Sequence, residues 1–441
     1  MKYSKNLFGK PAMITVALIL CTFQAFGQVP EFHTGNVLPF QSDHVHASTI
    51  VQLSNGDLLV AWFQGSGERQ SDDVKIFGAR KKYGSNKWSP PFVMADVKGF
   101  PDINPVLFID GKHRLWLMWY TVLANQWETS LLKYRISEHY LDMLGAPQWN
   151  WQADLHVKFG NTDHGIQPND PFVQSVKKQL AIYKKTYTSS KHHISYKKWK
   201  SHILARAEGK KLVKQGRIYR KDGTYKHAQL GYPLFRRIGW QTRNKPFITK
   251  SGRLILPLYS DGFSFSVMVY TDNWGKTWKF SNPLVGAGNI QPTIAKTTSG
   301  MLVAYMRDNG PAPKRLHVSH STDEGETWSP VKDSSLPNPG SAADIVTLKN
   351  GDWVLAYNDT KKGRNSLAVA ISPNDGKSWP WKKKIEYDTS KNPKTASYPA
   401  IIQGRKGNIY LTYSFHKPSG GNKRRQTIKF AEFNEAWIKT K

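Results

Sequence analysis

The segment Ser321-Thr-Asp323-Glu-Gly325-Glu-Thr327-Trp328 follows the pattern S-x-D-x-G-x-T-W and predicts a tight turn between two strands. Ser and Asp side chains accept hydrogen bonds from backbone N–H groups in such turns. Glycine supplies a positive φ without steric cost, and tryptophan fills the space beneath the turn. The octapeptide therefore indicates a β-structure with a structured connection.

Two looser copies of this octapeptide occur in the chain. They are Thr271-Asp-Asn273-Trp-Gly275-Lys-Thr277-Trp278 and Ser372-Pro-Asn374-Asp-Gly376-Lys-Ser378-Trp379, with Asn at the Asp position. The closing tryptophans stand at 278, 328 and 379, so the intervals are 50 and 51 residues. Self-similarity at a fixed period of this length is typical of solenoids and propellers.

A second repeat consists of an alternating strand, a glycine turn and another strand. The second strand of each unit ends in aromatic residues such as Trp62-Phe63 and Trp119-Tyr120. Six clear units surround the turns at Gly56, Gly111, Gly252, Gly300, Gly351 and Gly407.

The number of blades depends on the gap between the second and third units. From Asn104 to Lys245 the chain runs for 141 residues, too long for one step of about 50. Residues 172–176 and 180–183 supply a weaker seventh strand pair. We therefore predict an all-β, seven-bladed β-propeller, with six blades and a long insertion as the alternative. Residues 184–220 form a basic excursion, and residues 428–433 are expected to pair with residues 37–40 and close the ring.

The first 27 residues have the pattern of a secretory signal peptide. Lys2, Lys5 and Lys10 form a positive region, residues 12–23 are apolar but too short to span a bilayer, and small residues precede Gln28. A lipid anchor at Cys21 is disfavoured by the bulky Leu20. We expect residues 1–27 to be removed and residues 28–441 to form one catalytic propeller domain, exported to the periplasm or the medium, without a membrane span.

The chain is strongly basic, with a formal net charge of +31 that falls to +28 without the three leader lysines. Such a charge favours polyanionic partners. Export argues against nucleic acid, so an acidic polysaccharide is the expected partner, and a generally basic surface is the alternative. Cys21 is the only cysteine, which excludes disulfides and thiolate metal sites from the mature chain. The 14 histidines are scattered, and neither a metal nor a cofactor is predicted; the oligomeric state stays open.

Polar residues recur where a propeller would place its channel mouth. In an antiparallel blade the first strand starts, and the second ends, at the same face, and ligand sites form at such concave places. We predict a polar binding funnel there. First-strand starts contribute His44, His46, Asn104, His164, Arg243, Asn244, Lys245, Gln291 and Tyr398. Second-strand ends contribute Tyr120, Asp261, Arg307 and His416.

The three turns, known as Asp boxes, occur together with the runs Arg307-Asp-Asn-Gly, Gly340-Ser-Ala-Ala-Asp344 and Ser397-Tyr-Pro-Ala. This combination resembles the sialidase-like (BNR/Asp-box) β-propeller superfamily over essentially the whole mature chain. The resemblance implies the fold more specifically than it implies the activity.

Sialidases bind the substrate carboxylate with three arginines, the first of them in an Arg-Ile-Pro run. Here that run reads His46-Ala47-Ser48, whereas Arg307 and Arg364 match the two later arginines. The resemblance also places Tyr398 at the nucleophilic tyrosine and Asp73 near the acid. The missing first arginine counts against sialidase activity.

Histidine at the mouth looks more like the seven-bladed propellers that act on ulvan, as lyases and as an oligosaccharide dehydratase. β-Elimination at a uronic acid needs a cation for the carboxylate, a base, and an acid for the leaving oxygen. The candidate cations are Arg243, Lys245 and Arg307. The candidate bases and acids are His44, His46, His164, Tyr120 and Tyr398. Substrate-binding roles fall to Asn104, Asn244, Lys245, Gln291, Asp261, Arg364 and His416.

Three functions are therefore open. The first is a carbon–oxygen lyase that forms a 4,5-unsaturated uronate in ulvan-like, carboxylated and sulfated polysaccharide or oligosaccharide. It acts as a lyase if C4 carries a sugar and as a dehydratase if C4 carries a hydroxyl. The second is an exo-sialidase or another glycoside hydrolase, and the third is a non-catalytic glycan-binding propeller.

Overall fold

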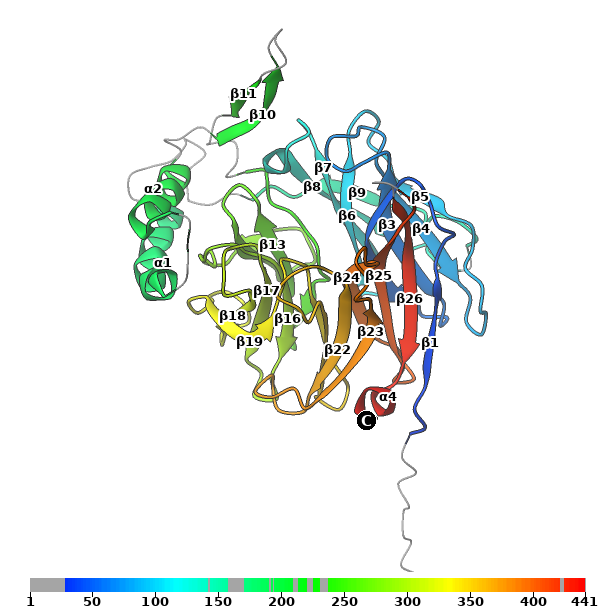
Figure 1. Cartoon of the computed structure of the whole chain (residues 1–441). Helices are drawn as coiled ribbons and strands as arrows, with labels where there is room; N and C mark the ends of the chain where they lie inside the picture. Colours follow the sequence, from blue (N-terminus) through cyan, green and yellow to red (C-terminus); the bar gives the residue numbers. More distant parts are fainter. Residues whose placement is uncertain are drawn as a thin grey trace, which may run out of the picture.

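The protein is a six-bladed β-propeller (Figure 1). The computed structural model describes residues 28–141, 143–157, 170–189, 192, 194–208, 213–219, 225–230, 237–420 and 424–440. Six antiparallel sheets have four strands each. The prediction of seven blades is therefore wrong, and the alternative of six blades with a long insertion is correct.

Each blade is a meander of consecutive strands, with the last blade completed by the first strand of the chain. Blade 1 contains β2 (His44–Gln52), β3 (Leu58–Gly65), β4 (Lys75–Lys81) and β5 (Phe92–Ala95). Blade 2 contains β6 (Asp102–Ile109), β7 (Leu115–Val122), β8 (Ser130–Ser137) and β9 (Trp151–Asp154). Blade 3 contains β12 (Phe247–Ile248), β13 (Leu254–Ser260), β14 (Phe265–Thr271) and β15 (Lys279–Phe280). Blade 4 contains β16 (Asn289–Lys296), β17 (Leu302–Asp308), β18 (Arg315–Ser321) and β19 (Lys332–Pro337). Blade 5 contains β20 (Asp344–Thr347), β21 (Trp353–Tyr357), β22 (Ser366–Ser372) and β23 (Trp381–Tyr387). Blade 6 contains β24 (Thr395–Gln403), β25 (Ile409–Pro418), β26 (Arg424–Phe433) and β1 (Phe32–Asn36).

The six predicted hairpins are the first and second strands of the six blades, which confirms that part of the sequence analysis. These strands carry the core. All eight residues of β7 are buried, for example, because its two faces pack against neighbouring blades. Continuous apolar runs are typical of strands buried on both faces.

The ring closes by pairing the two ends of the chain. β1 pairs with β26 in antiparallel register, from Phe32 opposite Phe433 to Asn36 opposite Lys429. The Val37 N–H donates to the Ile428 carbonyl at 2.8 Å, so pairing continues into the predicted segment. The predicted closure is confirmed, with the strand itself a few residues earlier than residues 37–40. Figure 1 shows β1, in blue, and β26, in red, side by side.

The long insertion between β9 and β12 explains the error in the blade count. The predicted seventh strand pair falls within α1 (Pro171–Thr188), which α2 (Tyr196–Ala207) follows. Asp170 accepts from the Phe172 N–H at 2.9 Å and Pro171 opens the first turn, a strong start signal for a helix. The buried side chains recur at helical spacing: Phe172, Val173, Val176, Gln179, Leu180, Tyr183 and Tyr187.

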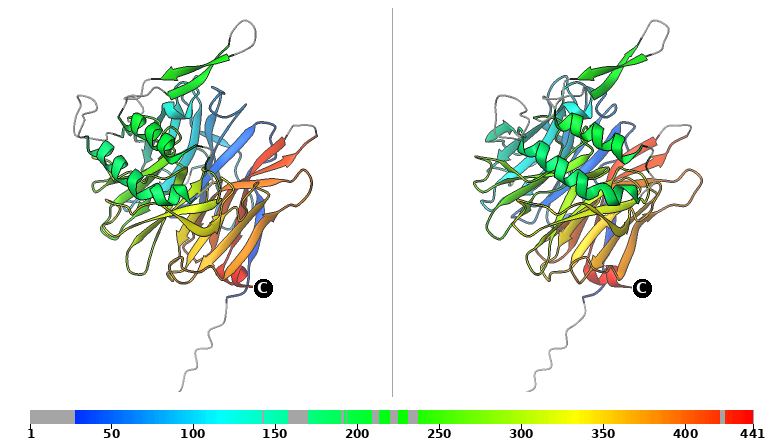
Figure 2. Two further views of the ribbon diagram at one scale, coloured as in Figure 1. Left: turned by 60° about the vertical axis from the view of Figure 1, so that its left-hand side comes forward. Right: turned by 90° about the vertical axis from the view of Figure 1, so that its left-hand side faces the viewer.

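The insertion packs on the outside of the ring. Phe172 contacts Phe263 of blade 3, with ring centroids 5.7 Å apart. Figure 2 shows α1 and α2 against one flank of the propeller, while β10 (Val213–Tyr219) and β11 (Tyr225–Leu230) form a separate projecting hairpin. Within the predicted basic excursion, residues 184–220, the structure describes the end of α1, α2 and β10. The predicted signal peptide and His164 lie outside the described residues. Within the described part of the chain, every helix falls short of the length and apolar character that a membrane crossing needs.

The three Asp boxes connect the third and fourth strands of blades 3, 4 and 5. In the box after β18, Asp323 accepts from the Ser321 hydroxyl at 2.8 Å and from the Thr327 N–H at 2.9 Å. Trp328 is buried, and its indole N–H donates to the Gly325 carbonyl at 3.0 Å. Third strands end at the face opposite the channel mouth, so these boxes stabilise the blades away from the site.

Candidate active site

Four of the innermost strands carry the same distortion at the channel mouth. The pairing register shifts in β2, β6, β16 and β24 near their first residues. Within each shift one residue has positive φ: Ala47 at 55°, Asn104 at 49°, Gln291 at 56° and Tyr398 at 56°. A bulge re-aims a side chain, and a non-glycine residue at positive φ stores backbone strain. Sequence reasoning found three of these residues but not the bulges that orient them.

Tyr398 lies at the centre of the site. Its hydroxyl oxygen accepts from Arg307 Nη1 at 2.9 Å and from Gln291 Nε2 at 3.0 Å. The Arg364 guanidinium carbon lies 5.4 Å from the centroid of the tyrosine ring. Burial alone would raise the pKa of Tyr398, but Arg307, Arg364 and the Gln291 hydrogen bond outweigh it and lower the pKa. The phenol is thus prepared to lose its proton.

Arg307 and Arg364 can receive an anion. Arg307 donates otherwise to the side-chain oxygens of Gln291 at 3.2 Å and Asn309 at 3.1 Å, and Arg364 Nη2 donates to the Gly340 carbonyl at 2.9 Å. Among the described residues neither guanidinium forms a salt bridge with a carboxylate. Half-buried arginines without an acidic partner favour the binding of a carboxylate from outside.

Arg243 lies beneath the tyrosine ring. Its guanidinium carbon is 4.9 Å from the Tyr398 centroid, and its nitrogens donate to the carbonyls of Pro399 at 3.0 Å and Ser48 at 3.4 Å. The side chain is buried, and burial lowers its pKa. Arg243 therefore holds the bulges of β2 and β24 together. It was predicted as the cation that meets the substrate, and its contacts are with these carbonyls and the Tyr398 ring.

Asn244 and Lys245 are held by the protein. Asn244 donates to the carbonyls of Gln291 at 3.2 Å and Pro292 at 3.0 Å, which supports the bulge of β16. Lys245 Nζ donates to the Asp344 carboxylate at 2.8 and 2.7 Å. The structure does not bring Lys245 to Tyr398, because its ammonium is used to join blades 3 and 5. Both were predicted to bind substrate, and their contacts are with the scaffold.

Three histidines gather beside Tyr398. The His46 ring lies 4.2 Å from the Tyr398 ring, 5.5 Å from His44 and 5.7 Å from His416, between centroids. Burial, followed by the charges of His44 and His416, places the pKa of His46 well below its usual value, so the ring is neutral. Its Nδ1 has no hydrogen-bond partner within the part of the chain that the structure describes.

A buried hydrogen-bond network forms the floor of the funnel. The Asn104 amide donates to the hydroxyls of Tyr120 at 3.0 Å and Tyr259 at 3.3 Å. Gln291 links Tyr259, at 3.4 Å, to Tyr398. Burial raises the pKa of Tyr120 and of Tyr259, so both stay protonated. Tyr120, predicted as an acid or base, is thus a neutral part of the floor.

Asp261 adds a carboxyl group at the end of β13. Burial raises its pKa to about 6, although Arg307 acts in the opposite direction. Its backbone N–H donates to the Gln241 side-chain oxygen at 3.2 Å. A carboxyl group with this pKa can donate a proton near neutral pH.

Sequence reasoning missed Glu68, Arg69 and Tyr259. Glu68 Oε1 lies 3.1 Å from His44 Nε2, and the Arg69 guanidinium carbon lies 5.0 Å from the Trp127 ring. Glu68 and Arg69 belong to the loop directly after β3. Because β3 is the second strand of its blade, it ends at the channel mouth, and this position was the signal that could have identified them. In the same loop Asp73 accepts from the Ser66 N–H and hydroxyl, at 3.0 and 2.8 Å, so its contacts are those of a loop cap.

The described side chains of the site do not form a metal-binding group. Within the described ranges, no group of three or more His, Cys, Asp or Glu residues has an arrangement that could hold a metal ion. What the site does combine is a phenol with a lowered pKa, two guanidiniums open to an anion, neutral histidine and a protonatable carboxyl group.

The sequence matches the family model described as a BNR repeat-like domain over residues 56–230 and 235–411. The chain belongs to the BNR repeat-like family. Similarity to an anhydrosialidase from Macrobdella decora is 26% identity over 140 residues, which is 29% of this chain and 17% of that protein. The resemblance to sialidase-like propellers is thus confirmed.

Solved structures share the fold of this BNR repeat-like chain. A protein of unknown function from Dyadobacter fermentans has a TM-score of 0.59 at 13% identity, covering 91% of this chain and 97% of its own. The intramolecular trans-sialidase from Ruminococcus gnavus, solved with oseltamivir carboxylate, has a TM-score of 0.55 at 16% identity, covering 90% and 96%. At sequence identities this low, the structural similarity shows that the fold is shared and does not show which reaction is catalysed. The reaction has to be inferred from the side chains of the site.

Proposed function

We propose that this protein cleaves a glycosidic bond of a carboxylate-bearing sugar, with Tyr398 as its nucleophile. The observation that carries the proposal is the Tyr398 hydroxyl, which accepts hydrogen bonds from Arg307 at 2.9 Å and Gln291 at 3.0 Å and has a lowered pKa. Adjacent cations stabilise a phenolate, and a phenolate is a far better nucleophile than a phenol. Similarity to sialidases and trans-sialidases supports the same reaction class.

The proposed reaction has two steps. Tyr398 first loses its proton to solvent, and Arg307 and Arg364 bind the sugar carboxylate. The Tyr398 phenolate then attacks the anomeric carbon, and the bond to the leaving oxygen breaks as that oxygen takes a proton from Asp261. Water or a hydroxyl of the sugar itself then displaces the tyrosine and returns a proton to Asp261. The pKa of Asp261, about 6, suits a group that alternates between acid and base.

His46 sets this site apart from one with three arginines. A neutral imidazole can contribute a hydrogen bond but no charge. With two guanidiniums for the carboxylate, we expect weaker binding of sialic acid than of an acidic sugar whose hydroxyl meets His46.

The decisive variant is Tyr398→Phe, which removes only the hydroxyl. We expect kcat/KM on the best substrate of an acidic glycoside panel to fall about 10²- to 10⁴-fold, the usual contribution of a positioned proton-transfer or nucleophilic group. Tyr413→Phe is the matched control, because Tyr413 is buried in the same blade with its hydroxyl on Glu386 at 2.7 Å, away from the site. A fluorinated sugar that slows the second step should add its mass to a peptide containing Tyr398. Unchanged turnover in Tyr398→Phe would sink the proposal.

A carbon–oxygen lyase acting on a uronic acid is the second candidate, favoured by the histidines beside Tyr398. Here Arg307 and Arg364 neutralise the carboxylate, and His46 or Tyr398 removes the C5 proton. The C4–O bond breaks, a C4–C5 double bond forms, and an acid protonates the leaving oxygen. Products decide between the candidates. A new ultraviolet absorbance from ulvan fragments indicates elimination, loss of water without chain shortening indicates a dehydratase, and a reducing sugar without that absorbance indicates hydrolysis.

The proposed substrate is anionic and the proposed location is outside the cytoplasm. The net charge of +28 for residues 28–441 supports a sulfated or carboxylated glycan. The leader-like pattern of residues 1–27 supports export, and a mature protein that begins at Gln28 by mass spectrometry would establish it. If glycans bind but no product forms on any panel, the propeller is a binding module instead.

A further inference from the structure

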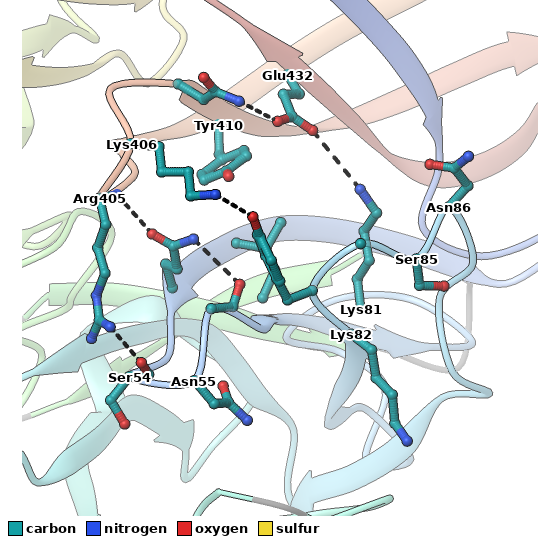
Figure 3. Close-up of a pocket in the computed structure, with 16 residues that line it drawn as sticks. Ser54, Asn55, Lys81, Lys82, Ser85, Asn86, Arg405, Lys406, Tyr410 and Glu432 are labelled. Atoms are coloured by element: carbon teal, nitrogen blue, oxygen red, sulfur yellow. Dashed lines mark hydrogen bonds and ion pairs between the residues drawn. The ribbon is translucent and has the colours of Figure 1, made fainter.

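A basic cavity lies between blades 1 and 6, on the face opposite the channel mouth. Its volume is about 510 Å³. Three connections line it: the β2–β3 turn, the β4–β5 loop and the β24–β25 turn. First and third strands end at this face, so the cavity is separate from the site around Tyr398. Figure 3 shows the lining side chains converging from these connections.

The charge of the lining is strongly one-sided. Lys81, Lys82, Arg405 and Lys406 face a single acidic residue, Glu432. That carboxylate is already engaged, by Lys81 at 3.9 Å and by the Asn408 amide at 2.7 Å. The cavity therefore offers a net positive surface to an anionic ligand.

An aromatic ring stands in this basic setting. Tyr83 is 59% exposed, and Lys406 Nζ lies 5.1 Å from its centroid. The backbone of Tyr83 is fixed by its N–H, which donates to Asp57 at 2.8 Å, and the ring is held by its hydroxyl, which accepts from Lys406 Nζ at 2.5 Å. Gly56, at φ +95°, lets the ring lie over the turn, since a Cβ there would stand 3.1 Å from Tyr83 Cγ. An exposed ring held this firmly is a ready platform for a ligand.

We propose that this cavity is a second, non-catalytic binding site for acidic oligosaccharide. The Tyr83 face would pack against the C–H face of a pyranose, the lysines and Arg405 would pair with sulfate or carboxylate groups, and Asn55, Ser85 and Asn86 would meet hydroxyls. A lipid surface fits less well, because the basic groups line a hollow instead of a flat, apolar-tipped face. The site is independent of the chemistry at Tyr398 and holds a polymer on the enzyme.

The test uses the double variant Lys82→Ala/Tyr83→Ala in a Tyr398→Phe background, which keeps the glycan intact. Lys384→Ala/Tyr387→Ala is the matched control. Tyr387 is 58% exposed with Lys384 Nζ 3.3 Å from its centroid, but this pair stands on β23 outside the cavity. Calorimetric titration with ulvan oligosaccharides should give two sites per chain for the control and one for the cavity variant. At the cavity, affinity should fall at least about tenfold, with no binding of maltohexaose in either variant.

The outcomes separate this proposal from the proposed function. If the funnel does not take the glycan, the stoichiometry falls from one to zero in the cavity variant, and the second site still stands. Equal binding in the cavity variant and the control would overturn it. Binding to phosphatidylserine vesicles in place of oligosaccharide would overturn it as well. Turnover of a small chromogenic substrate, measured with Tyr398 intact, should be unchanged by Lys82→Ala/Tyr83→Ala.

Discussion

The Asp box at residues 321–328 should contribute to stability and not to catalysis, and Asp323→Ala tests this directly. The carboxylate accepts from the Ser321 hydroxyl at 2.8 Å, from the Thr327 N–H at 2.9 Å and from the Thr327 hydroxyl. Alanine removes all three acceptor contacts. The box stands on the face opposite Tyr398, so no substrate contact is lost.

The magnitude follows from the number and exposure of these bonds. Each hydrogen bond contributes about 1 kcal/mol, and loss of a capping side chain costs about 0.5–2 kcal/mol. Asp323 is exposed, so we expect about 2 kcal/mol for Asp323→Ala rather than the full sum. With an unfolding entropy of about 2.1 cal/mol/K per residue over roughly 400 residues, this lowers Tm by about 2 °C.

The other two boxes supply an internal control. Asn273 accepts from the Thr277 N–H at 2.9 Å and donates to its hydroxyl at 2.8 Å, and Asn374 makes the same pair of bonds to Ser378 at 2.9 Å each. Asp323→Asn should therefore cost well under 1 kcal/mol. Scanning calorimetry of both variants, together with their kcat/KM values, tests whether Asp323 contributes to stability and not to catalysis. Equal Tm values for the alanine and asparagine variants, or a loss of turnover at unchanged Tm, would refute the reasoning.

Two further predictions concern the funnel. If Asp261 is the general acid, kcat/KM should fall as pH rises above about 6, because the carboxyl group is ionised above its pKa. Asp261→Asn should remove this pH dependence and lower the rate about 10²-fold or more. If the variant still loses activity above about pH 6 as the wild type does, Asp261 is not the general acid. Arg243→Met should leave the Pro399 and Ser48 carbonyls without their donor, destabilise the protein by about 2 kcal/mol and lower kcat more than it raises KM. Arg243→Lys should restore part of both, and wild-type kcat in Arg243→Met would show that the bulges hold their positions without it.

The fold was largely readable from local pattern. The strand–turn–strand units are the first two strands of the six blades, because turn glycines and buried apolar runs act over a few residues. The blade count failed at α1, where a short apolar run such as Leu180-Ala-Ile-Tyr183 fits a strand and a helix equally well. The Asp170 N-cap and Pro171, the first residue of α1, were the signals that could have identified the helix.

For the site, the sequence predicted which residues lie at the channel mouth but not which contacts their side chains make. Tyr398, Arg307, Gln291 and His46 were expected at the mouth, because the order of strands in a blade places those residues there. Lys245 was expected there too, and nothing local announces that Asp344, 99 residues away, takes its ammonium at 2.7 Å.

The sequence by itself determined six strand–turn–strand units, the closure of the ring and the list of polar groups at the mouth, since these depend on periodicity and chain direction. Only the tertiary structure decided which of those groups are open to a substrate. Tyr398 acquires its lowered pKa from arginines of two other blades, Arg243 is buried beneath it, and four bulges aim the floor of the funnel. Such properties arise from distances between residues far apart in the chain, and those distances exist only when the ring has closed.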